Sequence, residues 1–286
     1  MELSTLIVAL TNSVAWGCIL ALISLGLTLI YGQLEIINVA HGAMYTIGAV
    51  SAYYVTAFLG SWFLAIVVGP LVMGVIALGI YYSSLRFRIV GYPIAVTLII
   101  SYGFMFILEQ VLLLVYGGSP KMIASPIPYQ IEFLGASYPL YRLVAAGFSV
   151  AAIGALLLFL EKTRLGLWIR ATNQDHDTAS AMGVPVPKVY VLTYVIGTMM
   201  AALSGVIVAP MTSITHNMGH EILIAAFIIV IVGGFGSIRG TILAALIYSI
   251  VNGMFSTFID PVLSKGVTLC VMIGILLWKP EGLLKH

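Results

Sequence analysis

The sequence predicts an all-α protein that crosses a membrane several times. Of its 286 residues 61% are hydrophobic and only 8% are charged, and the mean hydropathy is +1.13. A soluble domain of ordinary composition carries about 25% charged residues. Twelve basic and ten acidic side chains cannot cover a globule of this length, so the remaining surface must face lipid. We treat residues 1–286 as one transmembrane domain.

Eight or nine membrane segments are expected, because a spanning helix needs about 20 mainly apolar residues. The first residues lack a basic n-region, so the first segment is interpreted as a span rather than a signal peptide. Segment 37–60 contains polar residues and glycines and is expected to be broken or only partly inserted, and 221–233 is short. The apolar segments are 6–31, 37–60, 62–85, 93–116, 139–160, 188–210, 221–233, 241–259 and 262–278.

The basic residues predict the orientation, because Lys and Arg are concentrated on the cytoplasmic side of membrane proteins. With the N-terminus outside and the C-terminus in the cytosol, nine basic residues fall on one side and three on the other. The loop 117–138 is then external and the loop 161–187 is cytoplasmic. The nine are Arg86, Arg88, Lys162, Arg164, Arg170, Lys188, Arg239, Lys279 and Lys285, and the three are Lys121, Arg142 and Lys265.

The cytoplasmic loop predicts a short helix with defined ends. Thr172 or Asn173 is expected to cap its N-terminus, because short polar side chains accept hydrogen bonds from the first free N–H groups. Gly183 offers a left-handed C-terminal cap, and Pro185 prevents continuation. About ten helical residues, roughly 15 Å, are expected to lie parallel to the membrane.

Two interpretations of this helix stay open: it docks onto another protein, or it is a solvated connector. Acidic residues in a first helical turn are favoured by the positive end of the helix dipole. The helix is expected to have a small apolar side and a charged side, formed by Ala171, Ala179 and Met182 and by Asp175, His176 and Asp177 respectively.

Three polar residues are expected at membrane depth. Glu109 lies about two turns before Gly117, and it either lines a path or locks helices together, or it reaches water at the outer interface. Asn38 and His41 are three residues apart, which would place them on one helical face. This pair either lines a translocation path or forms hydrogen bonds between helices.

The run GGFGSIRG at 233–240 predicts a tight structural turn, because glycine adopts backbone conformations that other residues avoid. It contains Gly233, Gly234, Gly236, Arg239 and Gly240. A phosphate-binding loop is disfavoured, since no strand precedes the run and no Gly-Lys-Ser/Thr ending follows it.

The sequence gives little support for a metal site or for a catalytic site. His216 and His220 are four residues apart, but only Glu221 is near enough in sequence to act as a third ligand. No catalytic motif is found, and no metal or other cofactor is expected.

Five long stretches resemble the LivH-type permeases of ATP-driven (ABC) importers for branched-chain amino acids and related solutes. They follow the order of that family and cover nearly the whole chain. The segment MTSITHNMGHEILI after Pro210 departs from the family pattern. The matching stretches are GLTLIYGQLEIINVAHGAMYTIGA (26–49), RLGLWIRATNQDHDTASAMGV (164–184), YVIGTMMAALSGVIVAP (194–210), GGFGSIRG (233–240) and WKPEGLL (278–284).

The resemblance implies a multi-pass permease of the bacterial inner membrane. It pairs with a second permease chain, two cytoplasmic ATPase subunits and a periplasmic solute-binding protein, and it binds no nucleotide or nucleic acid itself. The stretch 164–184 is then the ATPase contact, with Arg170, Asp175, His176, Ala179, Met182 and Gly183 as its coupling residues. The solutes of the family range from leucine and valine to urea, amides and aromatic acids. The alternative is a self-contained secondary transporter or channel, which would need ion-coupling residues at mid-membrane.

Overall fold

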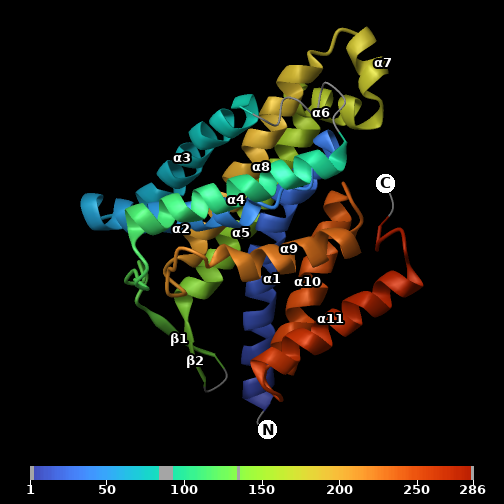
Figure 1. Cartoon of the computed structure of the whole chain (residues 1–286). Coiled ribbons are helices and arrows are strands. Elements are labelled where there is room, and N and C mark those ends of the chain that lie inside the picture. Colours follow the sequence, from blue (N-terminus) through green and yellow to red (C-terminus); the bar gives the residue numbers. More distant parts are fainter. Residues whose placement is uncertain (1–2, 84–92, 134–135, 285–286) are drawn as a thin grey trace.

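The computed structural model describes residues 3–83, 93–133 and 136–284, and these residues form an all-α bundle with one small hairpin (Figure 1). Eight of the described helices are long and apolar enough to cross a membrane, and α9 is a shorter apolar helix. The predicted fold class and number of segments are therefore confirmed. The helices are α1 (Leu3–Leu34), α2 (His41–Leu59), α3 (Trp62–Ser83), α4 (Ile94–Tyr116), α5 (Leu140–Lys162), α6 (Arg164–Gln174), α7 (His176–Ala181), α8 (Val186–Val208), α9 (Gly219–Gly233), α10 (Ile238–Phe255) and α11 (Pro261–Trp278).

Helix α1 is the centre of the bundle. It packs against α5, α8, α9 and α10, and 83% of its most apolar window is buried inside the protein. A helix that is apolar on all sides is expected to be buried or to span a membrane, and α1 does both. Its 32 residues extend over about 48 Å, so α1 is longer than the ~30 Å hydrocarbon layer.

Glycines let the central helices approach backbone to backbone. A Cβ atom added at Gly48 of α2 would lie well under 3.0 Å from the Ala202 carbonyl of α8, and one at Gly205 would lie equally close to the Tyr45 carbonyl. Lipid is as apolar as a leucine side chain, so close van der Waals packing is the main force that joins helices in a membrane. The α2–α8 contact is therefore among the closest backbone approaches that fix the helix positions.

The segment 37–60 differs from its prediction. The non-helical part is the connection 35–40, and α2 then continues unbroken from His41 to Leu59. Asn38 lies in this connection, so Asn38 and His41 do not share a helical face. Ser101 of α4 holds the connection, because its Oγ donates to the Ile37 carbonyl (2.9 Å) and accepts from the Val39 N–H (3.2 Å).

The two ends of the bundle carry different structures (Figure 1). Helices α6 and α7 lie at one end, and the N-terminus and an antiparallel hairpin lie at the other. The strands β1 (Gln130–Phe133) and β2 (Ala136–Pro139) pair with Gln130 opposite Pro139. The hairpin lies at the end of the loop 117–138 that was predicted to be external. Of the basic residues used to orient the chain, Arg86, Arg88 and Lys285 lie outside the described residues.

The α2–α8 contact leads to a test with two matched substitutions. Ala is about 0.8–1.0 kcal/mol more favourable than Gly inside a helix, so Gly79→Ala in α3 is expected to preserve or raise stability, because nothing lies within 4 Å of its Cβ position. Gly48→Ala forces α2 away from α8 and is expected to cost about 1–3 kcal/mol net. Thermal unfolding of both variants in detergent measures the difference, and equal melting temperatures would contradict the packing argument.

Candidate functional site

The segment between α5 and α8 forms two short helices rather than the one that was predicted. Thr163 ends α5 and caps α6, since its Oγ1 accepts a hydrogen bond from the Gly166 N–H (3.0 Å) and donates to the Phe159 carbonyl (2.7 Å). Gly166 is required here, because a Cβ at this position would collide with the carbonyl groups of Phe159 and Leu160. The chain therefore turns sharply where α5 ends.

Asp175 is the N-cap of α7, which corrects the predicted caps at Thr172 or Asn173. Its Oδ1 accepts hydrogen bonds from the N–H groups of Asp177 and Thr178, each at 3.0 Å. Helix α7 has six residues instead of about ten, because the residues before Asp175 belong to α6. Gly183 follows with φ +86°, the left-handed conformation that was predicted for it.

The hydrogen bonds around Asp175 also fix its charge. The Thr178 N–H and hydroxyl, followed by the Asp177 N–H, lower the pKa of the Asp175 carboxyl. This interaction supports the folded segment above the ordinary Asp pKa and is lost only as the pH falls through the lowered value. The cap therefore stays charged throughout the physiological range.

The predicted charged side of this segment is exposed, but the predicted apolar side does not form. Ala179 is 5% exposed and packs inward, whereas Met182 is 81% exposed, so these two residues do not form a common apolar side. We define the α7 surface as the exposed residues of this helix and its C-terminal end. They are His176, Asp177, Thr178, Ser180, Ala181, Met182 and Gly183.

A buried glutamine that the sequence analysis missed joins α6 to the central helix. Gln33 lies near the end of α1, is 8% exposed, and donates from Nε2 to the Ile169 carbonyl of α6 at 2.6 Å. A hydrogen bond between uncharged groups contributes about 0.5–1.5 kcal/mol to the stability of the folded state. The signal available in the sequence was a polar residue at the end of a long apolar helix, inside a stretch that resembles the family.

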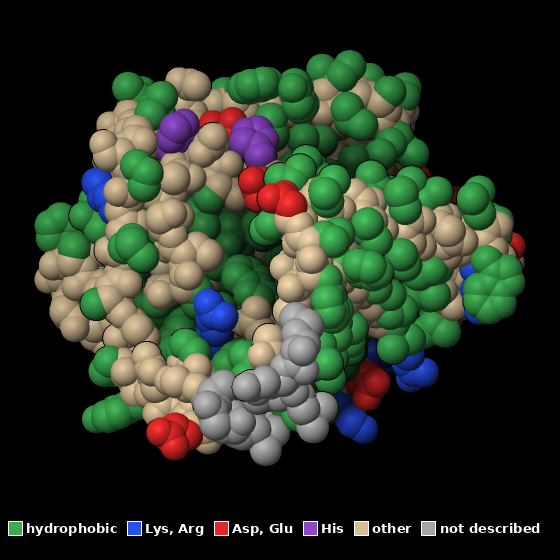
Figure 2. Space-filling model, turned by 90° about the horizontal axis from the view of Figure 1, so that it is seen from below, with side chains coloured by type: hydrophobic (Ala, Val, Ile, Leu, Met, Phe, Trp, Pro, Cys, Tyr) green, Lys and Arg blue, Asp and Glu red, His purple; other side chains and the backbone are tan. Residues whose placement is uncertain are grey.

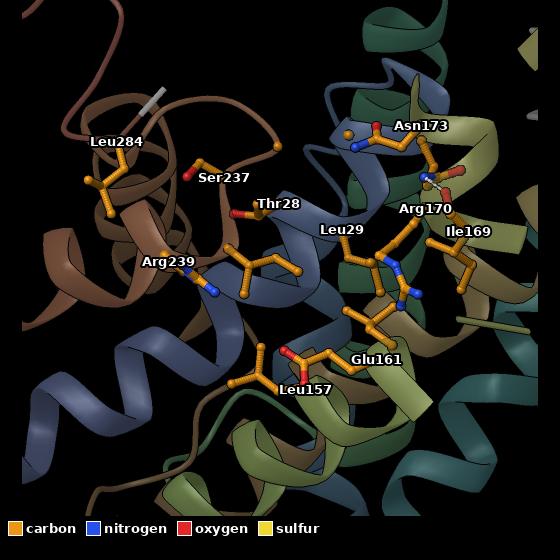
Figure 3. A pocket seen from close by; sticks show the side chains of 15 residues that line it. Thr28, Leu29, Leu157, Glu161, Ile169, Arg170, Asn173, Ser237, Arg239 and Leu284 are labelled. Atoms are coloured by element: carbon orange, nitrogen blue, oxygen red, sulfur yellow. Dashed lines mark hydrogen bonds between the residues drawn. The ribbon is translucent and has the colours of Figure 1, made fainter. Parts of the chain in front are cut away.

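Two cavities lie around this junction. The first, of about 490 Å³, lies among the ends of α1, α5 and α6 and the start of α10 (Figure 3). The other, of about 410 Å³, lies between the end of α1, the α6–α7 junction and the start of α8. A third cavity of about 570 Å³ lies near the opposite end, among α1, α9, α10 and α11. The α6–α7 segment therefore adjoins two hollows rather than packing flat on the bundle.

The glycine run 233–240 forms the turn between α9 and α10. Gly234 and Gly236 have φ +98° and +80°, and Ser237 caps α10 by accepting from the Gly240 N–H at 3.2 Å. Arg239 lies in the first turn of α10 and lines the 490 Å³ cavity.

The C-terminal segment packs on this glycine turn, which the sequence analysis did not foresee. The Leu283 N–H donates to the Val232 carbonyl at 2.9 Å. A Cβ at Gly282, which has φ +90°, would collide with Gly234. Two stretches that resemble the family, 233–240 and 278–284, thus form one packed unit.

Glu109 contacts His220 rather than lining one of the three cavities. Its Oε1 lies 2.8 Å from Nε2 of His220, and the exposed fractions of the two side chains are 11% and 44%. The pair joins α4 to the start of α9, and α4 makes few other contacts with the bundle. The geometry thus favours helix locking near one interface over a path-lining role.

Asn38 and His41 are both fully buried and line none of the three cavities. His41 bridges α2 to α1, with Nε2 donating to the Ile23 carbonyl at 3.1 Å. Nδ2 of Asn38 approaches the Met44 sulfur at 3.6 Å. The geometry of His41 favours the interhelical interpretation, whereas the Asn38 contact is local. A role of either residue in the path stays a prediction.

The loop 117–138, which is expected at the outer face, is joined to the segment 211–220 that precedes α9. Lys121 and Ile214 form an antiparallel bridge with N–H to carbonyl distances of 3.1 and 2.8 Å, and the Tyr116 hydroxyl also donates to the Ile214 carbonyl. Figure 2, which views the molecule from this end, shows a hollow with hydrophobic side chains at its floor and histidine and acidic side chains on its rim. We call residues 117–133 and 211–220 the outer surface.

His216 lies in a turn before α9 and His220 in its first turn, so they do not share a helical face. Among the described residues, no group of three His, Cys, Asp or Glu side chains is arranged to hold a metal ion. His220 is instead the partner of Glu109.

A bundle with eight candidate spanning helices and a short capped segment at one end defines a multi-pass membrane protein. The family model described as "Branched-chain amino acid transport system / permease component" matches residues 9–276, so the chain belongs to this family. It is a multi-pass permease subunit of the inner (cell) membrane, and its relatives are transport subunits rather than enzymes.

The similar proteins are permeases from bacteria and archaea. The chain is 29% identical to the high-affinity branched-chain amino acid transport permease LivH of Salmonella typhimurium, over 96% of this chain and 93% of LivH. It is 27% identical to BraD of Pseudomonas aeruginosa, over 96% of this chain and 94% of BraD. The xylose/arabinose import permease XylH of Sulfolobus acidocaldarius is 31% identical over 55% of this chain and 45% of XylH. No solved structure matches the chain significantly.

The cap of α7 can be tested directly. Asp175→Ala removes the acceptor for two N–H groups, so the amides of α7 are expected to exchange hydrogen roughly tenfold faster. Asp175→Asn keeps an acceptor oxygen and is expected to exchange nearly as the unmodified protein does. Hydrogen exchange with mass spectrometry reports both, and identical exchange in the two variants would show that Asp175 does not cap the helix.

Proposed function

We propose that this chain is the membrane-spanning subunit of an ATP-driven importer, in which it pairs with a second permease chain. Two cytoplasmic ATPase subunits and a periplasmic solute-binding protein complete the assembly. The observation that carries the proposal is the α6–α7 segment, which combines a capped, exposed surface with a direct hydrogen bond to the central helix. The permease names of the relatives support the same function.

The α7 surface is the proposed contact for an ATPase subunit. Asp175 and Gly183 define the two ends of α7, so its exposed side chains are held in fixed positions. Movement of this surface reaches α6 through the Asp175 junction and reaches α1 through Gln33. An ATPase can shift the permease between two states only if it contacts α7 differently in each of them.

The outer surface is the proposed contact for the binding protein. Its two segments are joined by the Lys121–Ile214 bridge, and they lie at the opposite end of the bundle from α7 (Figure 1). The bias in basic residues supports the orientation in which α7 faces the cytosol and the outer surface faces the periplasm.

The proposed solutes are branched-chain amino acids. The relatives that match over nearly their whole length, LivH and BraD, are named for this transport. The sugar permease XylH matches only about half of the chain, so it carries less weight for the solute.

A self-contained secondary transporter is less well supported. Such a protein needs ion-coupling groups at mid-membrane, whereas the buried carboxylate of Glu109 is engaged by His220 at 2.8 Å. Among the described residues, Glu109 is the only buried acidic side chain.

Purification of the tagged chain from its native membrane in mild detergent tests the assembly. Mass spectrometry is expected to find two ATPase chains and a second permease in stable association. Isolation of the chain alone, or as a stable homo-oligomer, would contradict the proposed importer.

Substitution at both ends of α7 tests the coupling role. The double variant Asp175→Lys with Gly183→Trp is expected to abolish ATP-driven uptake while the chain still inserts, because it removes the cap and places a large side chain at φ +86°. The matched control, Asp175→Asn with Gly183→Asn, keeps an acceptor and a residue that tolerates the left-handed conformation, so uptake is expected to remain. Normal transport by the first variant would contradict the proposed docking role of α7.

Glu109→Gln separates the two transport mechanisms. Gln keeps a hydrogen-bond acceptor for His220 but cannot release a proton, so an ATP-driven importer is expected to keep uptake within about twofold, since a partly exposed ion pair contributes only ~0.2–1 kcal/mol. An ion-coupled transporter that uses Glu109 would lose concentrative uptake. Transport into vesicles with and without ATP, and with and without a proton gradient, distinguishes these outcomes.

A further inference from the structure

Three charged side chains from three different helices line the 490 Å³ cavity without pairing with one another. They are Glu161 near the end of α5, Arg170 of α6 and Arg239 in the first turn of α10. Figure 3 shows them around one open space. No ion pair within 4 Å and no side-chain hydrogen bond to another described residue is formed by any of the three.

The space between the two arginines suits a carboxylate. Arg170 and Arg239 approach from opposite walls (Figure 3), and guanidinium groups bind carboxylates through paired, charge-assisted hydrogen bonds. Helix α10 begins beside Arg239, and the N–H groups of a first helical turn lack intrahelical partners. Both the side chains and the start of the helix therefore favour a negative group.

Glu161 adds a negative charge to the lining of the same cavity. An inorganic anion would be repelled by this carboxylate, whereas a ligand that also carries an ammonium group would be attracted to it. The remaining lining is largely apolar. It includes Leu29, Leu157, Leu160, Ile169, Ile238 and Leu284.

The combination indicates a small zwitterion with an apolar side chain. A volume of about 490 Å³ lies within the range of small-molecule sites, roughly 300–1,000 Å³. It is well suited to one free amino acid, while a phospholipid with two acyl chains would extend out of it. The cavity lies at the end of the bundle that carries α6 and α7, which is the proposed cytoplasmic end.

We propose that this cavity is an exit-side binding site for a branched-chain amino acid. The solute carboxylate lies between Arg170 and Arg239, its ammonium group faces Glu161, and its branched side chain packs on the leucines and isoleucines. The inference rests on the proposed function for the solute class, and it assigns Arg170 to the solute rather than to the ATPase surface.

The 570 Å³ cavity at the other end does not offer the same chemistry. Its charged residues, Lys265 and Glu221, already pair with each other at 2.8 Å. A zwitterion there would have to break this pair before it could bind. The exit-side cavity differs because its three charged side chains form no ion pair with any other residue that the structure describes.

Binding of three ligands tests each group of the zwitterion. The assembled permease complex in lipid nanodiscs, without binding protein or ATP, is titrated with L-leucine, with leucinol (which lacks the carboxylate) and with 4-methylpentanoate (which lacks the ammonium). L-leucine is expected to bind at least tenfold more tightly than either analogue. Equal affinity for all three, or no binding of L-leucine, overturns the site.

Substitutions assign the binding to this cavity. Arg239→Gln is expected to weaken L-leucine and 4-methylpentanoate about tenfold but to leave leucinol unchanged, while Glu161→Gln is expected to weaken L-leucine and leucinol but not 4-methylpentanoate. Arg164→Gln in the first turn of α6, outside the cavity lining, is the matched control and is expected to change nothing. If neither Arg239→Gln nor Glu161→Gln changes the affinity for L-leucine, the proposed site is wrong.

The outcomes also separate the alternatives. If the two cavity variants lose a co-purifying phospholipid and do not alter leucine binding, the cavity is a lipid site and the inference is wrong. If the chain co-purifies with ATPases but binds no amino acid here, the importer stands and only the exit site fails. Specific leucine binding by a chain that purifies alone would instead contradict the proposed assembly.

Discussion

Close backbone approach among the central helices is the constraint on which the rest of the structure depends. Lipid provides no hydrophobic force that drives one helix against another, so packing distance decides which helices associate. Gly26 with Gly197, Gly48 with Ala202 and Gly42 with Gly219 bring α1, α2, α8 and α9 into contact at the level of the backbone. Helices α4 and α11 have only 22% and 17% of their spanning windows buried, so they are peripheral.

This rigid centre determines how the α6–α7 segment can act. Gln33 lies on α1, and its hydrogen bond to Ile169 attaches α6 to the most buried helix of the protein. Gly166 and the Thr163 cap hold the other end of α6 against α5. A displacement of α7 therefore acts on elements that also line the 490 Å³ cavity, so the proposed ATPase contact and the proposed solute site would be mechanically linked.

The C-terminal segment belongs to the same unit. Its last described residues pack on the glycine turn between α9 and α10, and Leu284 contributes to the cavity wall. The positive φ angles at Gly234, Gly236 and Gly282 allow this contact, since side chains at these positions would be strained. The turn is structural, yet it also positions Arg239 in the lining of the cavity.

The sequence by itself determined the membrane class, the number of spanning segments and most of their limits, because the length of an apolar run reports directly on the thickness of the bilayer. It also identified the left-handed Gly183 and the glycine turn, which are local properties of the backbone. Predictions that needed the positions of neighbours were less successful: Asp175, not Thr172 or Asn173, caps α7, and Asn38 lies outside α2.

Only the tertiary structure showed that Glu109 pairs with His220, that Gln33 holds α6, and that Glu161, Arg170 and Arg239 surround one cavity. Each of these sets joins helices that are far apart in the chain, and hydropathy and spacing contain no information about which helices meet.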